Sequence, residues 1–130
     1  MSGTDSRVEI RRRRGRKAAS RGMIAEARAA AALEADGWAI WARRARTAAG
    51  EIDLIAEKEG LLAFVEVKAR PGLAEAAAAL SLRQRVRLLK AAEIVLAAHP
   101  EWGHRGVRFD VIVVDRTGSV RRIKDAFRQE

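Results

Sequence analysis

The stretch from Gly50 to Arg70, GEIDLIAEKEGLLAFVEVKAR, limits the folds open to this chain more than any other. Apolar residues alternate with other residues in both of its halves, which is the pattern of two half-buried strands. At its midpoint an acidic residue precedes glycine, a pair that suits a two-residue hairpin loop. A hairpin closed by that loop places Asp53 opposite Glu66 and Glu51 opposite Lys68.

Asp53 and Glu66 therefore bring two carboxylates together on a hairpin that is otherwise rich in Ile, Leu, Val and Phe. Side chains directly opposite each other have Cβ atoms about 4.5–5.5 Å apart, and like charges at that separation destabilise a sheet. A divalent metal ion compensates such a pair, and Mg²⁺ binds carboxylate oxygens. Lys68 projects from the same face as Glu66. The hairpin predicts a metal site with the pattern Asp, Glu-x-Lys. The alternative is an ordinary Glu51–Lys68 ion pair, with both acids in solvent.

Three strings in this chain, GEIDLIA, FVEVKAR and RFDVIVVD, resemble the YraN family of small bacterial endonuclease-like proteins. Asp53, followed at a distance by Glu66-Val67-Lys68, resembles the active-site signature of the PD-(D/E)xK nuclease superfamily. The resemblance extends from about Gly22 to Phe127. It implies a restriction-endonuclease-like α/β fold, with a mixed central sheet flanked by helices. It also implies metal-dependent cleavage of phosphodiester bonds in DNA, including branched or repair intermediates.

The same resemblance implies a role for each site residue. Asp53 and Glu66, with the backbone carbonyl of Val67, would bind Mg²⁺ or Mn²⁺. Lys68 would orient or help to deprotonate the attacking water and stabilise charge on the phosphorane. Glu26 matches the acidic residue that the superfamily carries on its first helix, and it would join through a water molecule or a second ion.

A helix is predicted from Ala18 to Asp36, because this segment is rich in alanine, has Ser20 as a possible N-cap and ends at Gly37. One stripe at helical spacing carries Met23, Glu26, Ala30 and Leu33. A carboxylate suits packing against a sheet poorly, so Glu26 is a candidate site residue on this ground too. The alternative is that Glu26 lies at the edge of the stripe and reaches solvent.

The remaining elements follow from the same patterns. A second helix is predicted over Ser81–Ala98, where Ser81 and Gln84 form a capping box. Gln84 alternatively matches a catalytic Gln of some superfamily members. The expected apolar side of this helix comprises Leu82, Val86, Leu89 and Leu96. Further strands are predicted over Trp38–Arg46, Val107–Asp115 and 119–123, with an ion pair between Arg108 and Asp110. This order predicts an α/β fold in a single domain over residues 18–130.

The charge of the chain indicates a polyanionic partner. It contains 26 Lys and Arg against 17 Asp and Glu, for a net charge of +9 and a pI near 11.3. Nucleic acid, and DNA in particular, is the expected partner, with a membrane surface as the rival. No apolar run approaches the length of a membrane span, no signal peptide is recognisable, and there is no cysteine. A cytoplasmic protein is expected, and oligomer formation stays open.

Basic residues gather in three places. Residues 1–17 carry seven of them against two acids and predict a disordered arm that contacts phosphates. The other two groups are candidate phosphate contacts, and they comprise Arg43, Arg44 and Arg46 on the first strand and Arg83, Arg87 and Lys90 on the second helix. Solvated basic surfaces are the alternative for all three. The tryptophans are expected in the core or covering an edge of the sheet, in preference to stacking on bases. A nucleic-acid-binding protein that keeps the fold with little or no catalytic activity is the second functional hypothesis.

Overall fold

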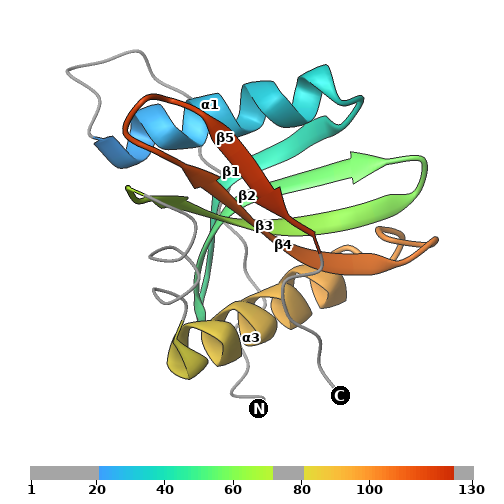
Figure 1. Cartoon of the computed structure of the whole chain (residues 1–130). Helices are drawn as coiled ribbons and strands as arrows, with labels where there is room; N and C mark the ends of the chain where they lie inside the picture. The colour runs from blue at the N-terminus through green and yellow to red at the C-terminus, as the bar shows by residue number, and fades with distance from the viewer. Residues whose placement is uncertain (1–20, 72–80, 125–130) are drawn as a thin grey trace.

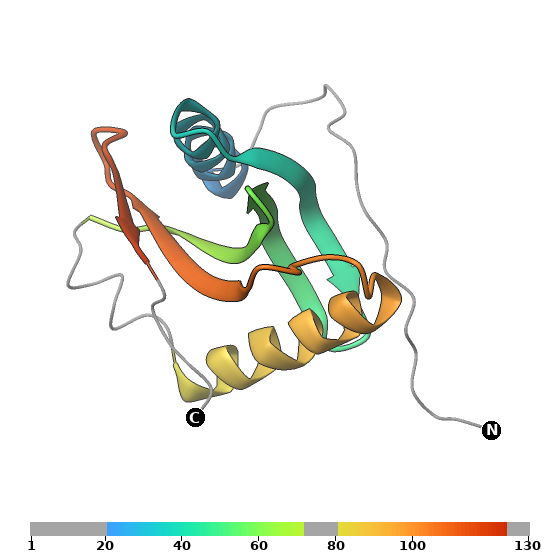
Figure 2. The same ribbon diagram turned by 90° about the vertical axis from the view of Figure 1, so that its right-hand side faces the viewer.

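The computed structural model describes residues 21–71 and 81–124. They form a five-stranded sheet with one helix on each face (Figure 1). In chain order the elements are α1 (Arg21–Ala35), β1 (Ala39–Thr47), β2 (Gly50–Lys58), β3 (Leu61–Ala69), α3 (Leu82–Ala98), β4 (Val107–Val114) and β5 (Val120–Ile123). Figure 2 shows the sheet from another side, with α1 above it and α3 below. This is the α/β, restriction-endonuclease-like architecture that the sequence predicts. The predicted basic arm (1–17), the alanine-rich connection (72–80) and Phe127 lie outside the described residues.

The sheet is mixed because one of its four pairings is parallel. Its strands follow chain order, and β3 pairs with β4 in parallel while the other pairings are antiparallel. A parallel pairing needs a long crossover, which the segment containing α3 supplies. β4 has a strand on each side, and it is buried from Asp110 to Val114. This position explains why its sequence is a nearly continuous apolar run.

The hairpin of β2 and β3 has the predicted loop and register. Glu59 and Gly60 both have positive φ, 53° and 85°, as a two-residue type I′ loop requires. The two strands are paired from Lys58–Leu61 up to Leu54–Val65. Each of these pairs has the register predicted from the sequence, so the hairpin is confirmed over this length.

The helix α1 packs its small residues against the sheet. Its buried residues are Ala25, Ala29, Ala30 and Leu33. Met23, which was expected on the same stripe, has 40 % of its surface exposed, so that expectation is wrong. Three of the four buried residues are alanines, whose small side chains let the helix lie close to β3. The helix ends at Ala35, and Gly37 follows two residues later with a φ of 92°, as the predicted stop at this glycine requires.

The helix α3 has its predicted cap, but its buried face differs from the predicted one. Ser81 and Gln84 form both hydrogen bonds of the capping box, which accounts for Gln84 without catalysis. The buried residues are Leu88, Ala91, Ala92 and Val95. Leu82 and Val86 are 76 % and 42 % exposed, so their assignment to the core is wrong. At about 3.6 residues per turn they lie roughly a third to a half of a turn from the buried stripe.

Below α1, a buried carboxylate organises the side of the sheet formed by β4 and β5. Asp110 is fully buried and lies 2.9 Å from Nη2 of both Arg108 and Arg122. The predicted Arg108–Asp110 ion pair is thus confirmed, while the second arginine was not foreseen. Both guanidinium groups lie over the ring of Trp38, which is itself buried. The buried carboxylate is thus compensated by two half-buried guanidinium groups, and this pairing gives Asp110 a structural role.

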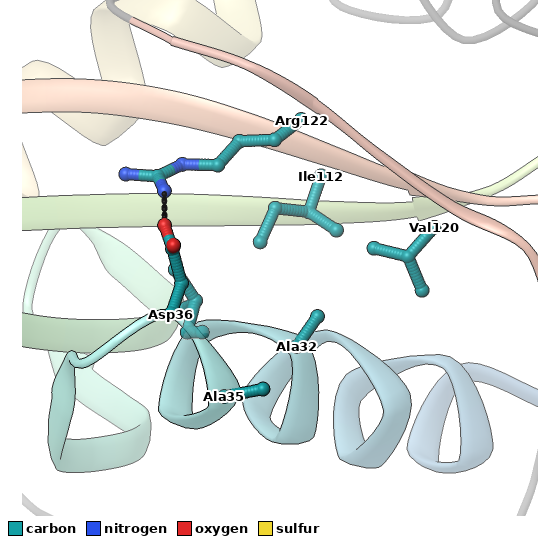
Figure 3. A pocket seen from close by; sticks show the side chains of 7 residues that line it. Ala32, Ala35, Asp36, Ile112, Val120 and Arg122 are labelled. Carbon is teal, nitrogen blue, oxygen red and sulfur yellow. Dashed lines mark hydrogen bonds and ion pairs between the residues drawn. The ribbon is translucent and has the colours of Figure 1, made fainter.

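A pocket of about 380 Å³ lies between α1 and the strands β4 and β5 (Figure 3). Its walls are largely apolar, and they include Ala32, Ile112 and Val120. The two charged side chains at the pocket, Asp36 and Arg122, form an ion pair with each other at 3.4 Å. Because that pairing occupies the charged groups, the pocket offers no catalytic constellation. The carboxylates of the hairpin lie elsewhere.

Candidate active site

The two strands of the hairpin separate at Asp53, and its side chain replaces a backbone partner there. The ladder between β2 and β3 ends at Leu54–Val65, one position before Asp53 would pair with Glu66. Asp53 Oδ2 instead accepts a hydrogen bond of 2.8 Å from the backbone N–H of Val67. The N–H and C=O of a strand residue point to the same neighbour. The carbonyl of Val67 is therefore directed towards the Asp53 side of β3, as a metal ligand at this position requires.

Opposite Asp53, Arg44 interrupts the alternation of β1. Its φ of 52° lies in the left-handed region, which residues other than glycine rarely adopt. Ala42 and Ala45 both pack into the cluster of apolar residues beneath α3, although side chains three apart on a regular strand face opposite ways. Arg44 reaches the other face of the sheet, where its Nε lies 3.4 Å from Oε2 of Glu26 on α1.

β2 has a matching irregularity at Asp53. Ile52 and Ile55 both pack beneath α3, whereas Leu54 packs beneath α1. Asp53 and Arg44 lie between the cross-strand pairs Arg43–Leu54 and Ala45–Ile52. Two adjacent strands thus depart from regular alternation at the same level. Irregular backbone of this kind often marks a functional site, because the surrounding structure must hold it in place.

Burial and repulsion raise the pKa of Asp53 to about 7 from its ordinary value of 3.8. Burial is the larger cause, and the charge of Glu66 is the next. The hydrogen bond from Val67 opposes the increase, while Glu26 and Glu51 add to it. A carboxylate that is hard to ionise beside other acids indicates a shortage of positive charge. A bound cation would supply that charge.

Glu26, from α1, lies at the other side of this acidic group. Its side chain is 12 % exposed, which excludes the alternative that it reaches freely into solvent. Burial raises its pKa, although the neighbouring Arg44 and, more weakly, Arg43 act in the opposite direction. Glu26 is therefore placed close enough to influence Asp53 but is held by Arg44. Its predicted contact with a second ion stays a prediction.

Glu66 and Lys68 are both buried, at 7 % and 8 % exposure, and Lys68 Nζ lies 3.4 Å from Glu66 Oε2. Glu51 pairs with a different residue, Arg46, whose Nε is 3.5 Å away. Glu51 and Lys68 thus each pair with a different residue. The Glu51–Lys68 ion pair, which was the alternative to a metal site, is not the pairing that the structure has. Burying a lysine and a glutamate together is costly for a purely structural role.

The donors at the opening of the hairpin fit a hard divalent cation. Two carboxylates, Asp53 and Glu66, and the Val67 carbonyl provide oxygen ligands, and Mg²⁺ usually takes one or two carboxylates and keeps several waters. Over residues 21–71 and 81–124, no three Asp, Glu, His or Cys side chains converge on one metal position. A cation held by these two carboxylates would need water or other ligands to complete its coordination.

The predicted phosphate contacts differ in whether a glutamate already pairs with them and in how exposed they are. Arg44 and Arg46 each pair with a glutamate, at 3.4 and 3.5 Å, and Arg43 is half-buried. The exposed row on α3 comprises Arg83, Arg87 and Lys90. Arg87 lies against Gly50 at the start of β2, where an added Cβ would come within 2.8 Å of Arg87 Cδ. The basic row therefore reaches the strand that carries Asp53.

Among the described helices, none has the length and apolar character needed to cross a bilayer.

Residues 25–114 match the profile of the uncharacterised protein family UPF0102. The chain belongs to the UPF0102 family. It is 67 % identical over 115 residues to a UPF0102 protein of Granulibacter bethesdensis, covering 88 % of this chain and 73 % of the relative. A relative from Azorhizobium caulinodans is 52 % identical over 119 residues, or 92 % of this chain and 91 % of its own. UPF0102 is the YraN family, so the predicted resemblance is confirmed. These names give the family and no activity.

Proposed function

We propose that this UPF0102 protein is a metal-dependent nuclease that hydrolyses phosphodiester bonds in DNA. The observation that carries the proposal is the opening of the hairpin, where two carboxylates and a lysine are held together with little exposure. Asp53, Glu66 and Lys68 occupy the positions that the PD-(D/E)xK pattern requires. The raised pKa of Asp53 supports the proposal, because a site built for a cation is electrostatically unfavourable without one.

Asp53, Glu66 and the Val67 carbonyl would hold Mg²⁺ or Mn²⁺. When bound, such an ion lowers the pKa of a coordinated water and neutralises charge on the phosphate. Asp53 is oriented for this role by its hydrogen bond from Val67 N–H, which leaves its other carboxylate oxygen for a ligand. Its proton would be released as the cation binds.

Lys68 would provide the positive charge that acts on the reacting phosphate. Its ammonium group lies 3.4 Å from Oε2 of Glu66. Lys68 would donate hydrogen bonds to the attacking water and to a phosphate oxygen. Donors fixed in a site from which water is largely excluded stabilise developing charge strongly. Glu26 would act from the far side of Asp53, and Arg44 would limit the charge that accumulates there.

The net charge of +9 supports a second candidate, a nucleic-acid-binding protein with little or no catalytic activity. Such a protein needs basic side chains. It gains nothing from acidic side chains that would repel a phosphate backbone, namely those of Glu26, Glu51, Asp53 and Glu66. The acids therefore favour the nuclease.

The experiment that separates the two candidates incubates the purified protein with linear and branched DNAs in Mg²⁺, in Mn²⁺ and in EDTA. The nuclease proposal expects products with either metal and none with EDTA. Tight binding of DNA without cleavage of any substrate in either metal would favour the binding protein instead.

A further inference from the structure

An aromatic cluster lies along the edge strand of the sheet, near the candidate active site. Trp41 on β1 contacts Trp102, with ring centroids 4.8 Å apart and planes tilted by 59°. Trp102 in turn stacks on His99, with 3.8 Å between centroids and 7° between planes. Trp41 keeps 39 % of its surface exposed, while Trp38 is almost fully buried. One side of the Trp41 ring is therefore supported by packing, and the side chain presents apolar surface to solvent.

The backbone directs Trp41 into this position. The pairing of β1 with β2 shifts between Ile40 and Ala42, so that Trp41 is an extra residue without a counterpart on β2. Bulges of this kind turn a side chain away from the regular alternation and are common at sheet edges and beside active sites. β1 forms an outer edge of the sheet. Covering the core needs no such bulge, since Trp102 already packs against the cluster beneath α3.

The Trp41 ring contacts Trp102 on the side of the sheet that carries α3, whereas Arg44 reaches the side that carries α1. One strand of nucleic acid would contact both by crossing the edge of the sheet that β1 forms. Trp41 precedes Arg44 by three residues, which is about 10 Å at about 3.3 Å per strand residue. Arg44 lies at the level of Asp53. Arg43 and Arg46 belong to the same strand, so β1 presents an aromatic ring followed by guanidinium groups. An aromatic ring combined with basic residues is how proteins bind single strands without reading their sequence.

From these observations we infer that Trp41 stacks on an unpaired nucleobase and that the nuclease site acts on DNA with a single-stranded segment beside the cleaved bond. The inference rests on the proposed function and specifies its substrate class. A base inside a duplex has both faces stacked on its neighbours, and it must be unstacked before Trp41 can contact it. An unpaired base already offers a free face.

Two substitutions test whether Trp41 is a stacking platform for a base, and both keep apolar bulk against Trp102. Trp41→Leu removes the aromatic face, and Trp41→Phe retains a smaller one. Anisotropy titrations with labelled oligo(dT) and with a duplex of equal length, in Ca²⁺, measure binding without relying on cleavage. We expect Trp41→Leu to bind oligo(dT) about 5- to 100-fold more weakly, because stacking by one aromatic side chain has this range. Trp41→Phe should keep most of the affinity, and duplex binding should be unchanged in both variants.

A measurement on the unaltered protein covers the case in which Trp41→Leu folds poorly. Oligo(dT) should quench the tryptophan emission more than the duplex does, since Trp41 is far more exposed than Trp38. Equal quenching by the two DNAs, or equal affinities of the wild type and a folded Trp41→Leu for oligo(dT), overturns the inference. If Trp41→Leu leaves oligo(dT) binding unchanged while the wild type still cleaves duplex DNA with Mg²⁺, the nuclease proposal survives and only the platform fails. Absence of binding to either DNA refutes both.

Discussion

Replacing Asp53 with asparagine should stabilise the metal-free protein at pH 8 and abolish its stabilisation by metal. The folded protein retains the Asp53 proton up to a pH of about 7, whereas the unfolded chain loses it near 3.8. The folded state therefore binds more protons between these values, and the free energy of unfolding decreases as the pH rises from about 4 to about 7. Above about pH 7 Asp53 is ionised in the folded protein, and the free energy that this ionisation costs has its full value. Asp53→Asn removes that cost.

The size of the effect follows from the pKa. An increase from 3.8 to about 7 corresponds to at most about 4 kcal/mol, at about 1.4 kcal/mol per pKa unit. The raised pKa already includes the hydrogen bond from Val67 N–H, and asparagine keeps an acceptor for that N–H as the neutral carboxyl does. A gain of up to about 4 kcal/mol is therefore expected at pH 8, which corresponds to a rise in melting temperature on the order of 10–20 °C for a small domain. At pH 5 the gain should fall to at most about 2 kcal/mol.

Thermal unfolding of both proteins in EDTA at pH 5 and pH 8 measures this gain. Repeating it with Mn²⁺ at about 100 times its Kd should stabilise the wild type by about 2.7 kcal/mol and leave Asp53→Asn unchanged. Asp115→Asn is the matched control. Hydrogen bonds from Thr117 lower the pKa of this exposed carboxyl, so the same substitution should decrease stability at pH 8. An Asp53→Asn protein that melts below the wild type at pH 8 in EDTA, or that Mn²⁺ still stabilises, would refute the reasoning.

Two further predictions concern the core and the basic arm. Asp110→Asn leaves two half-buried guanidinium groups without their carboxylate and should lower the free energy of unfolding by about 3 kcal/mol, measured by urea denaturation. A loss below about 1 kcal/mol contradicts the structural role of the cluster. Deleting residues 1–17 should weaken DNA binding and reduce the slope of log K against log salt, measured by anisotropy, by about 0.9 for each phosphate that the arm neutralises. An unchanged slope would mean that the arm does not bind DNA.

The sequence predicts the hairpin well because three local signals agree there. Alternation defines β2 and β3, the acidic residue before Gly60 defines the loop, and the loop then determines the register. The capping box of α3 is equally local, since Ser81 and Gln84 need only each other. The candidate carboxylates Asp53 and Glu66 could be proposed for the same reason. Their positions follow from the loop and do not depend on distant parts of the chain.

Features that depend on tertiary packing could not be predicted in this way. The buried stripe of α3 was misassigned because Leu82 and Val86 are as apolar as the buried Leu88, and only the position of the sheet distinguishes them. Nothing local marks the left-handed backbone of Arg44, which makes it a partner of Glu26 as well as a candidate phosphate contact. For Arg122 the signal was weak. A buried aspartate in a central strand needs counter-charge, but the sequence does not show which arginine reaches it.

The most direct test of the central claim is single-turnover DNA cleavage by Lys68→Ala with saturating Mg²⁺. The substitution removes one buried ammonium group and leaves Glu26, Asp53 and Glu66 in place. The account predicts that metal and DNA still bind, because the chain keeps 25 of its 26 basic residues, while the cleavage rate falls by about 10²- to 10³-fold. Lys124→Ala, which removes an exposed lysine after β5, should cleave at the wild-type rate. Cleavage by Lys68→Ala at the wild-type rate, in a preparation free of contaminating nuclease, would contradict the proposed mechanism.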